Sequence, residues 1–98
     1  MDFDLNEVGR QGYKMLQQMH IIGEKDKQDL TLKEREEVIN NLYDHLNMSI
    51  LKCRETLSHK HEFLSYWIIC VICFLDNTDL NKYVKITEKI NVFNYIKL

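Results

Sequence analysis

The sequence predicts an all-α fold: a small bundle of three or four helices around one buried central helix near residues 63–75. The stretch 63–75 holds thirteen residues without a charge. Strands usually span about 3–10 residues and membrane-spanning helices about 20, so this length favours a buried helix. The flanking segments carry apolar residues at spacings of three and four, which is typical of amphipathic helices. Short polar connectors separate them, and a bundle is the expected arrangement for such helices.

The first helix is expected over residues 5–22, where one apolar row follows a heptad spacing. The row consists of Leu5, Val8, Gly12, Met15, Met19 and Ile22. Gly12 costs about 1 kcal/mol of helix propensity relative to Ala, and a close crossing of another helix would compensate for it. Asp2 or Asp4 is expected to cap the start of this helix, and Gly23 its end.

The second helix is expected from Leu32 to about Leu57, after a polar connector at residues 24–31. Thr31 and Glu34 have the spacing of a capping box, in which each side chain bonds the backbone N–H of the other. The inward face is expected to comprise Ile39, Leu42, Leu46, Ile50, Cys53 and Leu57. At about 1.5 Å per residue this helix is close to 40 Å long and forms the scaffold of the fold.

Residues 58–62 are the expected turn before the central helix, although the second helix could also continue through them unbroken. Two apolar rows predict that the central helix is buried nearly all round. One row is Leu64, Ile68, Val71 and Leu75, and the other is Phe63, Trp67, Cys70 and Phe74. Residues 76–79 favour a turn, and a fourth helix follows from Leu80. The tail 91–98 fits a helix or an extended segment.

Length and composition indicate a single helical domain, residues 1–98. The net charge of −2 gives no overall attraction to nucleic acid, and the apolar stretch is too short to predict a membrane protein. Three cysteines without a leader segment favour the reducing cytoplasm. The chain lacks proline and alanine and is rich in Ile, Lys and Asn, as in AT-rich coding sequences of phages, other viruses or mobile elements.

Cysteine and histidine residues raise the possibility of a zinc site. Cys70 and Cys73 form a C-x-x-C pair, and Cys53, His59 and His61 lie nearby in the sequence. The pair lies inside the most apolar stretch, however, where loss of a thiol proton is unfavourable. Free cysteine is commonly buried, so we expect buried thiols and neither a metal nor a cofactor.

Arg54 and His59 enclose four residues, and this spacing resembles the R-x4-6-H motif of the HEPN family. That family comprises all-helical domains, many of which are RNases of toxin–antitoxin and defence systems. The resemblance implies that Arg54 stabilises phosphate charge and that His59 is the acid–base group, with His61 as a neighbouring candidate. Short spacings of this kind often arise by chance, so the sequence favours solvated side chains at the end of the second helix, and the HEPN-like RNase is the alternative function.

The function that the sequence favours is a small non-enzymatic interaction protein that binds and modulates a protein partner. The heptad row offers more apolar surface than a small core is expected to cover, so we also expect a homodimer or larger assembly. The candidate interface residues are Leu5, Gly12, Tyr13, Met15 and Met19. The alternative for these residues is that they fill the core of the monomer.

Overall fold

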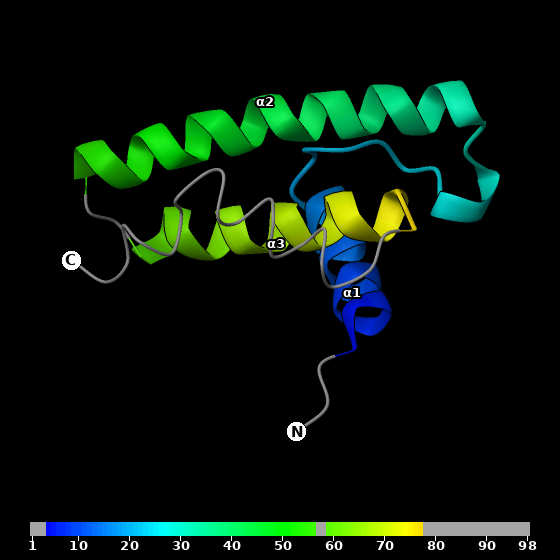
Figure 1. The fold of residues 1–98 in the computed structure, drawn as a ribbon, viewed down its shortest axis with the longest axis horizontal. Coiled ribbons are helices and arrows are strands. Elements are labelled where there is room, and N and C mark those ends of the chain that lie inside the picture. The colour runs from blue at the N-terminus through cyan, green and yellow to red at the C-terminus, as the bar shows by residue number, and fades with distance from the viewer. Residues whose placement is uncertain (1–3, 57–58, 78–98) are drawn as a thin grey trace.

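The structure, a computed structural model, describes residues 4–56 and 59–77, and the side chains among them at positions 4–52 and 61–77. The described elements are α1 (Leu5–Gln18), a short 3-10 helix η1 (Lys27–Asp29), α2 (Leu32–Thr56) and α3 (His59–Leu75). The helices pack on one another, which confirms the predicted all-α fold (Figure 1). The expected fourth helix and the tail lie outside the described residues.

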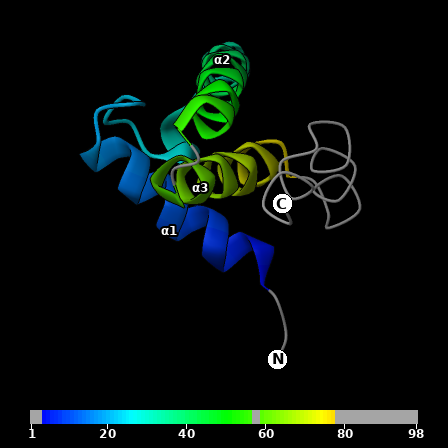
Figure 2. The ribbon, with the colours of Figure 1, turned by 90° about the vertical axis from the view of Figure 1, so that its left-hand side faces the viewer.

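Helix α3 is the middle layer of the fold. Figure 2 shows it between α2 on one side and α1 on the other, and the main helix–helix contacts are α1 with α3 and α2 with α3. Helices α2 and α3 run antiparallel, while α1 crosses them (Figure 1). Every residue from Ile68 to Cys73 is buried, so the prediction of a buried central helix is confirmed for this part.

The two apolar rows of α3 are not buried equally. In the row that ends at Leu75, three of the four residues are fully buried. In the other row Trp67 and Phe74 are half-buried and Phe63 is 67% exposed. Phe63 is therefore the exception to the predicted burial nearly all round, because the first row is covered more completely than the second.

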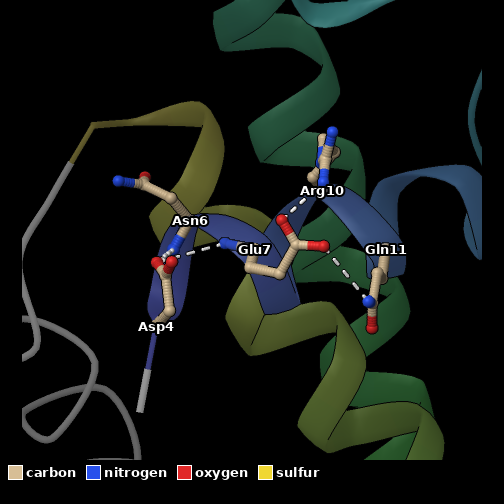
Figure 3. A network of polar contacts seen from close by, with 5 residues as sticks. All are labelled: Asp4, Asn6, Glu7, Arg10 and Gln11. Carbon is tan, nitrogen blue, oxygen red and sulfur yellow. Dashed lines mark hydrogen bonds and ion pairs between the residues drawn. The ribbon is translucent and has the colours of Figure 1, made fainter. Parts of the chain in front are cut away.

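Helix α1 begins at the predicted cap and ends earlier than expected. The Asp4 Oδ1 atom accepts the backbone N–H groups of Asn6 and Glu7 at 3.1 and 3.3 Å (Figure 3). At the other end His20 takes a left-handed conformation with φ 60°, and the N–H of Ile21 donates to the Leu16 carbonyl. The prediction of a helix to Ile22 with a Gly23 cap was wrong, because this turn brings Ile22 back onto the core.

Two glycines bring α1 close to α3. A Cβ atom at Gly12 would lie 2.9 Å from Trp67 Cε3 and from Val71 Cγ2, and one at Gly9 would lie 2.8 Å from Phe74 Cγ. Carbon atoms usually pack at about 3.5–4.0 Å, so neither position has room for a side chain. The close helix crossing predicted at Gly12 is confirmed, and Gly9 is a second crossing point.

The start of α2 confirms the predicted capping box. The Glu34 N–H donates to Thr31 Oγ1 and the Thr31 N–H donates to Glu34 Oε1, each at 3.1 Å. Farther along α2, Leu42 and Leu46 are fully buried against the core. These two residues therefore anchor the long helix to α3, as their place on the predicted inward face indicates.

The α2–α3 junction is shorter than predicted. Residues 59–62 were expected in a turn, but α3 already begins at His59. Ser49 Oγ lies 3.0 Å from the His61 carbonyl oxygen and 2.9 Å from Ser65 Oγ. Both serines are buried, and these hydrogen bonds satisfy their hydroxyl groups. The same bonds link α2 to the first turns of α3.

Candidate binding cleft

A cleft of about 650 Å³ opens where all four described elements meet. Its lining comprises Arg10, Tyr13 and Lys14 of α1, Asp26, Lys27 and Gln28 at η1, Arg35 of α2, Phe74 of α3 and Asn77. The Arg35 position follows from the capping box, which starts α2 at Leu32 and so places Arg35 in its first turns. The volume lies in the range of about 300–1,000 Å³ that is usual for ligand pockets.

The cleft is strongly basic although the chain as a whole is acidic. Among the described residues, four cationic side chains and one carboxylate line it, which gives four minus one, or +3, against a net charge of −2 for the chain. Arg10 is paired with Glu7 on the same helix (Figure 3). Among the described side chains, Lys14, Lys27 and Arg35 form no ion pair. Positive charge is therefore concentrated in the cleft without an equal number of carboxylates.

Lys27 is held against the end of α3. Its Nζ atom lies 4.3 Å from the centre of the Phe74 ring and donates to Asn77 Oδ1 at 2.6 Å. Asn77 has φ 51°, a left-handed conformation that asparagine tolerates well after a helix. Burial lowers the pKa of Lys27, and the positive charge of Arg35 lowers it further. The two cations are thus close enough to repel each other.

Arg35 carries a hydrogen-bond donor without an acceptor. Its Nε atom is buried and has no partner among the described residues. Nearly all buried polar atoms in proteins are hydrogen-bonded, and leaving one unpaired costs about 1–3 kcal/mol. The unpaired donor and the neighbouring Lys27 charge both favour the binding of an anion.

Tyr13 separates this cleft from a second one of about 340 Å³ with the opposite character. The described lining of the second cleft holds three glutamates, Glu24, Glu34 and Glu37, and one cation, Lys25. There the polar groups bond one another: Lys25 Nζ lies 2.9 Å from Glu34 Oε2, and the Tyr13 hydroxyl donates to the Lys25 carbonyl. Burial, followed by the Asp26 charge, raises the pKa of Tyr13.

The predicted interface residues have different surroundings. Gly12 and Tyr13 are buried against α3, with Tyr13 only 4% exposed, and Tyr13 lines both clefts. Leu5 and Met15 are half-buried, while Met19 is 45% exposed. Of the five, Met19 therefore offers the most surface to another molecule.

The basic cleft was missed by reasoning from the sequence. Its cations come from three separate segments, and no segment alone forms a basic cluster. Only Arg10 and Lys14, four residues apart on α1, share a helix face. Recognising the site required knowledge of how α1, η1 and α2 meet at the end of α3.

The HEPN-type residues lie at the opposite end of α3. Arg54 is in the last turn of α2 and His59 is the first residue of α3, but the side chains of both lie outside the described residues. His61 is half-buried, and its carbonyl oxygen accepts from Ser49 and Ser65. The proposed catalytic roles of Arg54, His59 and His61 stay predictions.

Cys70 and Cys73 are fully buried in α3, as predicted for structural thiols. Burial, followed by the nearby Cys73, raises the pKa of Cys70 to about 12. This thiol is therefore protonated at neutral pH. Among the described residues no three His, Cys, Asp or Glu side chains are grouped so that they could hold a metal ion.

No described helix has both the length and the apolar character needed to span a membrane. Comparisons with protein families, with characterised proteins and with solved structures gave no match. The basic cleft is the described feature that best supports a function.

Proposed function

We propose that this chain is a small non-enzymatic interaction protein that binds and modulates a protein partner, and that the basic cleft holds a negatively charged segment of that partner. The observation that carries the proposal is the group of cations in the cleft, of which Lys14, Lys27 and Arg35 form no ion pair among the described side chains. An anion from a partner would offset their mutual repulsion.

The position of Arg35 supports recognition by direct contact. A guanidinium presents several N–H donors in a fixed plane and binds oxyanions through two parallel hydrogen bonds. Its buried Nε has no acceptor in the described structure, so an incoming oxyanion would gain a hydrogen bond without displacing an internal one. Lys27, fixed by Phe74 and Asn77, adds a second charge that is already ordered.

Binding fits the cleft better than catalysis does. General acid–base catalysis is commonly performed by histidine, and nucleophilic catalysis by an activated Ser, Cys or Lys. Among the described residues the lining holds no histidine, cysteine or serine, and Tyr13 has a raised pKa. Lys27 has a lowered pKa, but its Nζ already donates to Asn77 Oδ1 and lies over the Phe74 ring. The cations of the lining can instead bind a negatively charged group.

The test compares what the protein retains from lysate of its native host when its charges are reversed. Tagged wild-type protein is expected to retain one stoichiometric partner, and Lys27→Glu and Arg35→Glu are expected to lose it. Lys33→Glu is the matched control, because it changes the charge equally at an exposed position outside the lining. Equal retention by all four proteins would refute the cleft as the contact site.

The proposal includes a viral or mobile-element origin, supported by a composition typical of AT-rich coding sequences, and a cytoplasmic location, supported by the three cysteines. It also includes self-association, supported by the apolar row of the first helix. Met19, exposed at the end of α1, is the candidate contact between copies. Light scattering is expected to show a homodimer or larger for the wild type and a smaller mass for Met19→Asp. A monomeric wild-type protein would contradict this part of the proposal.

A further inference from the structure

We infer that the group held in the cleft is a phosphate monoester, carried by a phosphorylated side chain of the partner, with its oxygens between Lys27 Nζ and the Arg35 guanidinium. This inference rests on the proposed function. It adds the chemical class of the bound group, which the cation cluster alone does not specify.

The number of charges favours a dianion. In the described lining the Arg10–Glu7 pair is neutral, and Asp26 offsets one of the other three cations, which leaves three minus one, or +2. A phosphate monoester carries about −1.5 to −2 at pH 7. A carboxylate supplies −1 and would leave one cation uncompensated.

The donors in the cleft also favour phosphate. Lys14, Lys27 and Arg35 are donors without acceptor capacity, and the buried Arg35 Nε has no partner among the described residues. Asn77 uses its Oδ1 to accept from Lys27, so its amide N–H₂ remains a donor beside that cation. Phosphate offers three strong acceptor oxygens, which suits several donors that converge from different elements.

The elements around the cleft form a cradle rather than a flat basic surface. The cations that line it belong to α1, η1 and α2, and Lys27 Nζ lies over the Phe74 ring of α3. Such an arrangement positions charge on several sides of one small group. A carboxylate offers two oxygens to these donors, whereas a phosphate monoester offers three.

The test titrates the full-length protein with the capped tripeptide Gly-phosphoSer-Gly and with its Gly-Glu-Gly and Gly-Ser-Gly counterparts, at low salt and pH 7.4. We expect one site and at least tenfold tighter binding of the phosphopeptide than of the glutamate peptide. Lys27→Gln and Arg35→Gln should each weaken it about tenfold or more, while Lys33→Gln should not. Lys14→Gln should also weaken the binding, and because Lys14 is exposed, this substitution is not expected to disturb folding.

Several outcomes would overturn the inference. Equal binding of the glutamate peptide would show that the cleft takes any carboxylate or phosphate. Adenosine monophosphate or inorganic phosphate binding tenfold tighter than the phosphopeptide would assign the site to a free small molecule. No phosphopeptide binding, with the partner still lost from Arg35→Glu, would refute the phosphate but keep the proposed function. Phosphopeptide binding, with the partner retained by Arg35→Glu, would refute the proposed function instead.

Discussion

Replacing Gly9 by alanine tests the contact that fixes α1 on α3. A Cβ atom at this position would lie 2.8 Å from Phe74 Cγ and closer still to Phe74 Cβ. The Phe74 Cβ atom is attached to the α3 backbone, so a change of rotamer cannot move it away. The substitution must therefore push the two helices apart.

The expected loss of stability follows from two opposing terms. Overpacking of a filled interface costs about 1–3 kcal/mol, whereas replacing a helical glycine by alanine returns about 1 kcal/mol of propensity. We expect Gly9→Ala to lower the free energy of unfolding by up to about 2 kcal/mol. Gly12→Ala should cost less, because the atoms it meets belong to the Trp67 ring and a Val71 methyl group.

Gly23→Ala is the matched control. A Cβ at Gly23 meets no atom within 4 Å and its φ is not positive, so alanine fits without strain. We expect a gain of about 0.4–1 kcal/mol from the lower entropy of the unfolded chain. Urea denaturation followed by circular dichroism measures all three variants. If Gly9→Ala is as stable as Gly23→Ala, the close packing of α1 on α3 is wrong.

Other contacts give further predictions. Thr31→Ala removes a helix cap and should lower the free energy of unfolding by about 1 kcal/mol in urea denaturation, and an unchanged midpoint would contradict the capping box. The hydrogen bond from Lys25, then that from the Thr31 backbone, lowers the pKa of Glu34 to about 2. Because the folded pKa lies below the unfolded one, its stabilisation is lost as the pH falls from about 4.5 to about 2. The urea midpoint should therefore fall more steeply with acid in the wild type than in Glu34→Gln, and parallel curves would argue against the pair. The Cys70 pKa of about 12 predicts that iodoacetamide at pH 8 labels this thiol only after denaturation, as peptide mass spectrometry will show; labelling of the folded protein would contradict its burial.

Features that depend on neighbouring residues could be predicted from the sequence. The capping box at Thr31 and Glu34 was predicted because both hydrogen bonds span only three residues. The buried part of α3 was predicted because it is the longest uncharged stretch, and Gly12 because glycine on an apolar helix row needs a close neighbour. In each case the local pattern already contained the physical cause.

Features that depend on the arrangement of distant segments could not be predicted. Helix α1 stops at Gln18 because a turn at His20 allows Ile22 to reach the core, and helix periodicity carries no sign of that turn. The basic cleft combines Lys27 and Arg35 with Phe74, which is far away in the sequence. The charged side chains of the cleft come together only when α1 and α2 have packed on α3.

The central place of α3 also decides when the chain can fold during synthesis. Helices α1 and α2 are translated first, yet the surface on which each of them packs lies mainly in α3. Gly9 meets Phe74, which is 65 positions later in the chain. Until residue 75 leaves the ribosome, the apolar faces of α1 and α2 are therefore open to chaperones and to other nascent chains. A chain that is truncated within α3 therefore lacks much of the surface on which α1 and α2 pack.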